Sequence, residues 1–374
     1  MMLKQNLMKE MIKKLNKFVV FFFLMASLFY QNKVFAQKYS NAFLQIGVGA
    51  AGQGLAYACV ASTDNTNAAY WNPAGIVRNN HNQWEISAMH SEWFGGIGKY
   101  DYLGVTLPGK NENQRIALSF IRFGVDDIPN TLSLYNDDGT INFDNLSSFS
   151  ASDYAFLFSY SKKMGKNTGI SPISMGLNAK IIHRNIGKFA NSWGFGLDAG
   201  VQYHKNNVKA GIMFRDITST FNVWRFSFSE EEKNILGITG NDLPSERLEI
   251  TNPQIVVGAS FLKRFNKIGI SPELDFFIQT DGRRNTIFST DKLSLDPAIG
   301  CEINFISKVF LRFGANQFQF FPVGNNQKTW AARPAFGAGF KTRSIQIDYG
   351  FNDPGIGNGA HSHIISTLVR FGGN

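Results

Sequence analysis

The chain has 374 residues, of which 35 are Phe, 36 are Gly and only 17% are charged. This composition is unusual for a soluble globular domain. The formal charge of +9 falls to about +4 when residues 1–36 are left out, so it gives no reason to expect a nucleic-acid-binding surface.

The first 36 residues have the features of a signal peptide. Five lysines between positions 4 and 17 precede Phe18–Tyr30, an apolar run of 13 residues that is too short to span a membrane comfortably. Val34-Phe35-Ala36 fits a small-residue cleavage site. We therefore expect residues 1–36 to be removed and the protein to be exported, and no later run is long enough for a transmembrane helix.

The stretch 37–80 differs from the rest of the chain. It is rich in Gly and Ala, carries almost no charge and includes Trp71-Asn72-Pro73-Ala74-Gly75 near its end. It shows neither the periodicity of an ordinary helix nor the alternation of a strand. We predict that 37–80 is a plug or hatch that packs inside a barrel formed by residues 81–374, and that the Asn-Pro-Ala-Gly turn precedes the first strand.

Alternation of apolar and polar residues dominates the chain after this segment. Between 173 and 181, and between 193 and 203, every second residue is apolar, with Gly and small polar residues between them. Trp193 and Tyr203 stand at the two ends of one apolar stripe, as in the aromatic girdles of membrane barrels. A closed antiparallel sheet pairs every backbone group within the protein, which the interior of a membrane requires. A secreted β-sandwich is the competing fold class.

The same pattern predicts fourteen strands, an even number as expected for a bacterial outer-membrane barrel. The predicted strands are 83–92, 99–107, 114–123, 153–162, 172–184, 192–204, 207–215, 253–262, 270–279, 296–305, 308–316, 333–341, 344–351 and 361–371. Connections after even-numbered strands are short, whereas the long ones follow odd-numbered strands. This asymmetry favours an all-β, 14-stranded antiparallel transmembrane barrel with the N-terminus on the periplasmic side.

Two long connections carry candidate binding residues. The loop 216–252 contains Trp224, Arg225, Phe226 and Phe228, followed by three glutamates. It is either a hairpin that extends past the membrane, with the glutamates in a solvated acidic turn, or a partner-docking patch, because exposed aromatic residues beside Arg are typical interface anchors. The acidic residues of the loop 124–152 are more simply a solvated surface than a divalent-cation site. They are Asp126, Asp127, Asp137, Asp138 and Asp144.

No catalytic or nucleotide-binding motif is present. Cys59 and Cys301 are expected to be small packing residues, because a secreted protein stabilised by disulfides would have more cysteines. A disulfide between them is the alternative, and it requires the hatch to touch the barrel wall. Four histidines are interpreted as strand-end or turn residues: His183, His204, His361 and His363. Eight charged residues are candidates for the barrel lumen: Arg115, Arg122, Lys180, Glu273, Asp275, Glu302, Arg312 and Asp348.

Three stretches of the N-terminal segment resemble the signature of the PorV/PorQ family, which lies within the FadL-like class of outer-membrane barrels. They are FLQIGVGA at 43–50, GQGLAYA at 52–58 and YWNPAG at 70–75. The stretch 349–363 is similar to the last hairpin of that family. The resemblance implies a fourteen-stranded barrel in a Bacteroidetes-type outer membrane. Trp71, Asn72, Pro73, Ala74 and Gly75 would then form the hatch motif.

The resemblance also implies two functions. PorV-like members serve the type IX secretion system by binding the large outer-membrane translocon barrel and the C-terminal signal domain of secreted cargo. FadL-like members are channels for the uptake of hydrophobic small molecules, with the N-terminal segment as a hatch. We predict a non-enzymatic shuttle subunit in the cell outer membrane, without cofactor or metal, and keep the channel as the alternative; a barrel lipid hydrolase that uses Ser and His near the rim is a third possibility.

The predicted functions differ in where apolar groups gather. A shuttle should present Trp224 and Phe226 on its outer loops, above a sealed lumen. A channel should show a continuous apolar cavity or an opening in the wall beside the hatch.

Overall fold

The computed structural model describes residues 40–79, 82–134, 140–165, 171–244, 247–322, 328–352 and 361–372, and the predicted signal peptide lies outside these ranges. The helices are η1 (Ala42–Gln45), α2 (Ala50–Gly54), α3 (Ala68–Trp71), η2 (Pro73–Arg78), η3 (Phe143–Asn145) and α4 (Glu230–Ile238). Among the described residues, no helix is both long and apolar enough to cross a membrane.

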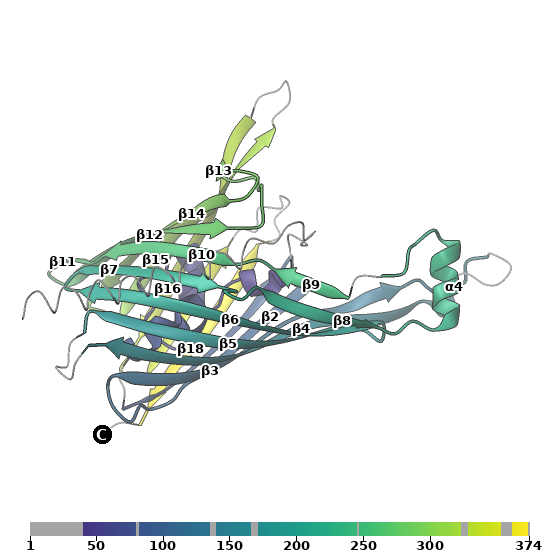
Figure 1. Cartoon of the computed structure of the whole chain (residues 1–374). Coiled ribbons are helices and arrows are strands. Elements are labelled where there is room, and N and C mark those ends of the chain that lie inside the picture. The colour runs from purple at the N-terminus through teal and green to yellow at the C-terminus, as the bar shows by residue number, and fades with distance from the viewer. Residues whose placement is uncertain are drawn as a thin grey trace, which may run out of the picture. The chain divides into compact units, whose positions relative to one another are not determined.

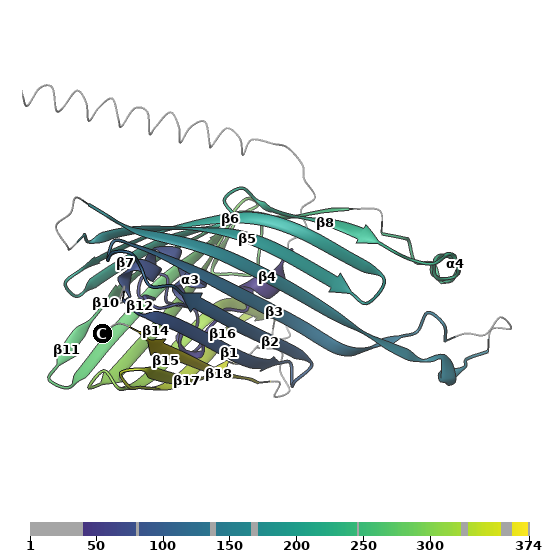
Figure 2. The same ribbon diagram turned by 90° about the horizontal axis from the view of Figure 1, so that it is seen from below.

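Fourteen antiparallel strands form one closed ring (Figures 1 and 2). Closure follows from the pairing of β1 with both β18 and β2. In order around the ring the strands are β1 (Trp84–Trp93), β2 (Gly98–Thr106), β3 (Gln114–Asn130), β4 (Ser147–Met164), β5 (Ile173–Ile186), β6 (Ala190–Lys205), β7 (Val208–Arg215), β10 (Gln254–Phe261), β12 (Ile268–Gln279), β14 (Ser294–Phe305), β15 (Val309–Pro322), β16 (Lys328–Lys341), β17 (Ile345–Asn352) and β18 (Ser362–Phe371).

Each of the fourteen predicted strands is present, so the predicted fold class is confirmed. Four further short strands extend the ring: β8 (Thr220–Phe226), β9 (Leu248–Thr251), β11 (Lys263–Phe265) and β13 (Phe288–Ser289). β8 pairs with β6 beyond the end of β7, and β9 pairs with β8. Several strands are longer than predicted at the end of the barrel that carries the long connections, because their hairpins continue past the apolar zone.

Apolar side chains face outward and small or polar side chains face inward, as the alternation predicts. On β5, Ile173, Met175 and Leu177 are exposed, whereas the residues between them are buried. Leu368 on β18 breaks the pattern in the sequence because its side chain points inward and is 3% exposed. Trp84 and Phe371 stack on each other at one end of the outer face, where an aromatic girdle is expected.

The inner face is not an empty lumen, because the N-terminal segment (residues 40–79) lies against it. Glycines on nine strands allow the segment to approach the wall closely. A Cβ atom at any of them would meet atoms of the segment within 3.4 Å. They are Gly104, Gly176, Gly200, Gly211, Gly258, Gly300, Gly314, Gly337 and Gly350. Eight of them form cross-strand pairs, such as Gly176 with Gly200 and Gly300 with Gly314. The glycine-rich face is therefore a contact surface for the N-terminal segment.

The two cysteines are free thiols and do not form a disulfide. Cys59 is buried in the N-terminal segment. Cys301 alternates with the inward-facing Gly300 and Glu302, so its side chain lies on the outer face of β14. The barrel wall separates the two sulfur atoms, although the segment does touch the wall.

The packing of glycine against the segment predicts that Gly176→Ala is destabilising. The added Cβ would overlap the backbone of Pro73 and Ala74, and overpacking of this kind costs about 1–3 kcal/mol. Gly237→Ala in α4 is the matched control, since nothing lies within 4 Å of a Cβ there. We expect the temperature at which half of the purified barrel unfolds, measured by heat-dependent gel migration, to fall for Gly176→Ala only. Equal half-unfolding temperatures for the two variants would contradict the close packing of Gly176 against the segment.

Candidate functional site

Trp71 organises the N-terminal segment. Its indole Nε1 donates a hydrogen bond to the carbonyl of Val48 at 2.9 Å, and its ring packs against Tyr57 and Tyr70. The side chain is 3% exposed. A Cβ at Gly52 would come within 3.0 Å of the indole, so this glycine is required for the close approach. The predicted hatch motif thus begins with the side chain that joins the two halves of the segment.

The rest of the motif fixes the segment to the wall. The Asn72 side chain is fully buried; it donates to the carbonyl of Val60 at 3.0 Å and that of Val201 on β6 at 3.2 Å, while its Oδ1 accepts from the Ala74 N–H. Asn72 therefore caps η2, which begins at Pro73. A Cβ at Gly75 would overlap the carbonyl oxygen of Thr63. The sequence predicted a turn leading directly into the first strand; instead the motif begins a short helix, and β1 follows at Trp84.

Three carboxylates of the wall receive backbone N–H groups of the segment. Asp275 accepts from the N–H groups of Cys59 at 2.8 Å and Val60 at 2.9 Å. Glu273 accepts from Ala61 at 2.8 Å. Each of these bonds satisfies a backbone donor of the segment that would otherwise be buried without a partner. These acidic residues of β12 therefore hold residues 59–61 in place.

The third carboxylate lies on the far side of the ring. Glu85 on β1 accepts from the N–H of Thr66 at 2.6 Å and from its hydroxyl at 2.9 Å. Its second oxygen pairs with Arg370 at 2.7 Å. The Thr66 hydroxyl also lies 2.8 Å from that of Thr106 on β2. The segment is thus bonded to opposite parts of the wall.

Further polar side chains of the wall bond to carbonyl groups of the segment. Asn178 bonds to Ala69, Gln202 to Val60 and Thr63, His204 to Ala61, and Asn316 to Ala56. In return, Arg78 at the end of η2 donates to the carbonyls of Pro172 and Gln202. Since most strands contribute either a close glycine or a hydrogen bond, the segment is fixed along its whole length.

The ladder of barrel strands is irregular where β6 passes from β7 to β8. β6 pairs with β7 from Ala199 onward and with β8 up to Phe195, so residues 196–198 of β6 stand opposite 215–220. The extra residues Asp216–Ser219 bulge out of the ladder, although the Ile217 N–H still donates to the Leu197 carbonyl of β6 at 2.9 Å. Both Asp216 and Ser219 have positive φ angles of 55°. This irregularity falls between Trp193 and Tyr203, the ends of the apolar stripe of β6, and therefore at membrane depth.

A buried lysine holds the bulge. Lys180 on β5 pairs with Asp198 at 2.7 Å and with Asp216 at 2.5 Å. The N–H of Asp216 donates to the carboxylate of Asp198 at 2.9 Å. Lys180 and Asp198 are 5% and 3% exposed. Breaking a buried pair of this kind leaves an uncompensated charge, so Lys180 is the main restraint on the bulge.

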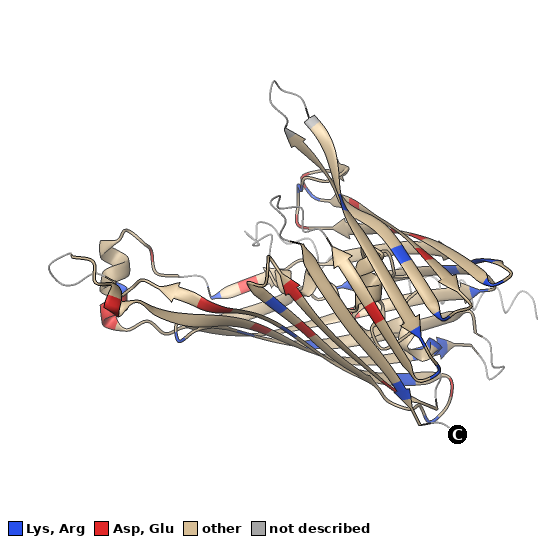
Figure 3. Cartoon of the chain, turned by 180° about the vertical axis from the view of Figure 1, so that it is seen from behind, with Lys and Arg blue, Asp and Glu red and all other residues tan. Residues whose placement is uncertain are grey.

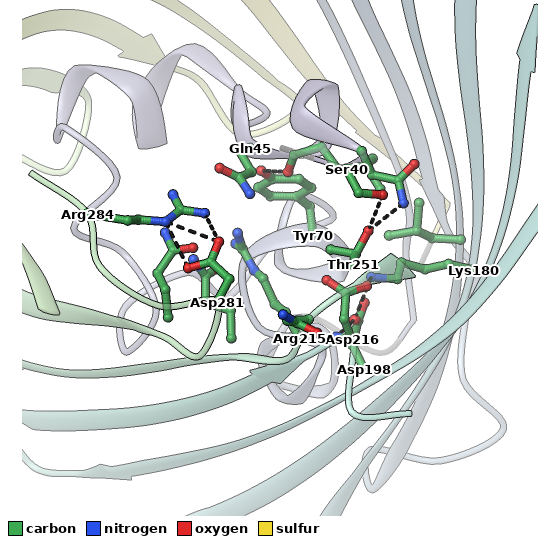
Figure 4. Close-up of a pocket in the computed structure, with 16 residues that line it drawn as sticks. Ser40, Gln45, Tyr70, Lys180, Asp198, Arg215, Asp216, Thr251, Asp281 and Arg284 are labelled. Carbon is green, nitrogen blue, oxygen red and sulfur yellow. Dashed lines mark hydrogen bonds and ion pairs between the residues drawn. The ribbon is translucent and has the colours of Figure 1, made fainter. Parts of the chain in front are cut away.

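The bulge borders a cavity of about 50 Å³ between the wall and the N-terminal segment (Figure 4). Tyr70, Leu44 and Leu157 contribute its apolar lining, and the Lys180 cluster lies on one side. The guanidinium of Arg215 lies 4.8 Å from the centre of the Tyr70 ring, within range of a cation–π interaction. The space is large enough for water only, so the passage beside the bulge is closed in this conformation.

A second cavity of about 240 Å³ lies on the other side of the segment. Its lining is largely polar and includes Asp64, Lys209, Glu302 and Arg312. Arg312 is satisfied by Glu302 at 2.8 Å and Asp348 at 2.7 Å. Among the described residues, neither of these cavities forms the continuous apolar passage that a straight channel through the barrel would need.

The candidate docking residues of 216–252 are part of an ordered structure. Trp224 donates to Glu249 at 2.8 Å and has the guanidinium of Arg184 over its ring. Phe226 stacks on Trp224, and Phe228 on Phe189. These three aromatic side chains are half-buried, whereas Arg225 is exposed. Their function as docking residues stays a prediction.

The predicted acidic turn after these residues is the start of helix α4. Ser229 and Glu232 form a capping box, a helix signal that is present in the sequence and that the prediction of a turn overlooked. The hydrogen bond from Lys188, together with the Ser229 N–H, holds the pKa of Glu232 below its usual range. α4 is thus tied to the β5–β6 hairpin through Lys188.

No group of three metal-binding side chains is found in the described part of the chain. Asp126 pairs with Lys99, and Asp144 lies in the first turn of η3. Asp137 and Asp138 lie outside the described residues. Burial raises the pKa of the Cys59 thiol well above its usual value, so this residue is not a reactive thiolate.

Seven of the eight predicted interior charges are confirmed, and Arg122 is wrong. Arg122 pairs with Asp101 on the outer face of the barrel, since it alternates with the buried Ile121. His204, predicted as a rim residue, points inward to the N-terminal segment. His183 packs between Tyr154 and Trp193 at the outer surface, and His363 bonds to Tyr349. Sequence reasoning did not single out Asp198 and Asp216, although Asp198 belongs to the polar set of its strand.

No protein-family model matches the sequence, and no curated protein matches it. Solved structures do. The CymD monoaromatic hydrocarbon channel has a TM-score of 0.52 at 12% identity, over 88% of this chain and 98% of that one. The toluene transporter TodX of P. putida has a TM-score of 0.50 at 10% identity, over 88% and 99%. A FadL homologue of Pseudomonas aeruginosa reaches 0.49 at 10% identity, over 87% and 98%. The fold is therefore that of a FadL-like barrel, and the protein lies in the outer membrane.

Proposed function

We propose that this protein lets hydrophobic small molecules cross the outer membrane and catalyses no reaction. The observation that carries the proposal is the interruption of the wall at Asp216–Ser219, at membrane depth and beside a cavity. The barrels with a similar fold include a monoaromatic hydrocarbon channel and a toluene transporter, which supports the same class of solute.

In the hydrocarbon layer each peptide group must be paired within the protein, so irregular backbone is tolerated only where protein or a water-filled cavity covers it. Residues 216–219 meet this condition because the cavity and Lys180 lie behind them. Outside, Phe195, Phe214 and Phe221 are exposed around the bulge. A hydrophobic solute can leave the barrel sideways here, once the bulge moves.

The N-terminal segment has a different role in this proposal. It blocks the straight route to the periplasm, since it is bonded to opposite sides of the wall through Asp275, Glu273 and Glu85. Moving it would break all of these bonds at once. The movable part in this proposal is the bulge, because fewer bonds hold it: those of Lys180, that from the Asp216 N–H to Asp198 and that from the Ile217 N–H to the Leu197 carbonyl.

The first test of the proposed transport route is the deletion of Asp216, Ile217 and Thr218. The deletion leaves Arg215, Ser219 and Thr220 opposite residues 196–198, so β7 and β8 become one continuous strand. Because the wall is then uninterrupted, we expect uptake of radiolabelled toluene by cells or proteoliposomes to fall to the level without the protein. Deletion of three exposed residues in a coil, 241–243, is the matched control and should leave uptake unchanged.

Both deletion variants must migrate as folded barrels in a gel when the samples are not heated. If the variant without the bulge folds and still takes up toluene at the original rate, the lateral route is excluded.

The second prediction tests whether the segment moves. Thr66→Cys together with Thr106→Cys places two sulfur atoms where the hydroxyls now lie 2.8 Å apart, in a protein whose Cys59 and Cys301 are replaced by Ala and Ser. We expect the oxidised, tethered form to take up toluene as fast as the same protein after reduction. Loss of uptake on oxidation that a reductant reverses would show instead that the segment opens as a hatch.

A second candidate function is a shuttle subunit of the type IX secretion system. It is favoured by the structure beyond the membrane, where the β3–β4 and β5–β6 hairpins, β8 and α4 extend on one side of the barrel (Figures 1 and 2). Phe143 is 72% exposed and Ile238 is 87% exposed there. Apolar groups on an ordered extracellular surface suit a protein partner, which would be the translocon barrel or the C-terminal signal domain of cargo.

The third prediction separates this function from transport. Replacing residues 229–244 with a short Gly-Ser linker removes α4 but keeps β8 and β9. If the protein is a shuttle, copurification of a large outer-membrane barrel or of secreted cargo from native membranes is lost, while toluene uptake is unaffected. If it is a channel alone, neither measurement changes.

A further inference from the structure

The short turns at one end of the barrel are strongly basic. Eight exposed cations lie on or next to these turns: Lys110, Lys162, Lys205, Lys263, Arg264, Lys267, Lys308 and Arg343. Glu112 is the one carboxylate on the described residues of the same turns. In Figure 3 the blue colour gathers at the end of the barrel that carries the C-terminus, whereas α4 at the opposite end is red. Basic residues are thus concentrated at the end with the short turns, and the acidic start of α4 lies at the opposite end.

The cations at the two ends differ in their partners. At the end with the long connections most cations are paired, as Lys99 is with Asp126, Arg122 with Asp101 and Lys188 with Glu232. In the described part of the chain, none of the eight turn cations forms an ion pair with a carboxylate. The basic rim therefore has no counter-charge within the protein that the structure describes.

The position of these cations relative to the apolar stripe identifies what they face. Lys162, Lys205 and Lys263 each follow an exposed aromatic residue by two positions, the first two within β4 and β6 and the third from the end of β10 to the start of β11. The aromatic residues are Tyr160, Tyr203 and Phe261. An aromatic side chain at the border of the hydrocarbon layer, followed by a long cationic side chain, places the cation at the level of the lipid head groups.

We infer that this basic rim binds the anionic head groups of the phospholipid leaflet at the periplasmic side of the outer membrane. The cations stand on several strands around the ring, as a planar lipid surface requires, rather than in one concave pocket as a small anion would. Basic residues near an anionic membrane surface are attracted to it individually, and the attraction decays within a Debye length. The rim would thereby fix the depth and the orientation of the barrel in its membrane.

The test uses the full mature protein in vesicles of phosphatidylcholine with a minor share of phosphatidylglycerol. Lipids retained by the protein after extraction in mild detergent are identified by mass spectrometry. We expect phosphatidylglycerol to be enriched about threefold over its share in the vesicle, and the enrichment to disappear at high salt. Lys205→Glu with Lys263→Glu should lower the enrichment to the vesicle composition. The neutral pair Lys205→Gln with Lys263→Gln should lower it to a smaller extent.

The matched control reverses two exposed cations at the other end of the barrel, Arg247→Glu with Lys292→Glu. This variant should retain the enrichment, and all variants must migrate as folded barrels before heating. Equal loss in the control and the rim variant overturns the inference, as does a protein without lipid preference. Binding of polyglutamate in the absence of any lipid preference also overturns it, because the rim then serves an acidic protein partner.

Discussion

Peptide groups in the hydrocarbon layer of a membrane find no water to bond with, so every strand needs a partner on both sides within the protein. β1 meets this requirement by pairing with β18 and β2, which closes the ring. A closed ring of this size has an interior, and the segment 40–79 lies in it. The glycines that face inward and the polar side chains that bond to the segment both follow from closure.

The N-terminal segment contains only short helical turns, so many of its peptide groups need partners outside it. The wall supplies them through Glu85, Glu273 and Asp275. Burying carboxylates is costly unless hydrogen bonds compensate, and here backbone N–H groups of the segment donate to all three side chains. The polar inner face of the barrel is therefore complementary to one particular chain, which explains why its polarity does not produce a wide aqueous pore.

Much of this fold is readable from the sequence because alternation has a physical cause at each face. Lipid selects apolar side chains outside, and the close approach of residues 40–79 selects Gly and Ser inside. The same alternation assigns Arg115 and Arg122 to different faces. They are an odd number of residues apart on one strand, so their side chains point to opposite sides of the wall. Treating both as interior residues overlooked a signal that the sequence contains.

The bulge and its restraint could not be predicted in the same way. Residues 216–219 have the composition of a loop, and they precede strand β8, whose alternation is short. The partners of Lys180 come from β6 and from the bulge itself, so the cluster exists only once β5, β6 and β7 are side by side. Composition identified the N-terminal segment as unusual but carried no information on which wall residues would hold it.

The contrast between these two parts of the interior determines which of them is able to move. The segment is held by carboxylates on opposite strands and by close contacts along its length, so its release requires many bonds to break together. The bulge departs from the ladder at Asp216 and Ser219, where non-glycine residues adopt a left-handed conformation that is costly unless the surroundings impose it. Lys180 and Asp198 impose it. This cluster and the bond from the Ile217 N–H to the Leu197 carbonyl are local to β5, β6 and the bulge, so moving the bulge breaks far fewer bonds than releasing the segment.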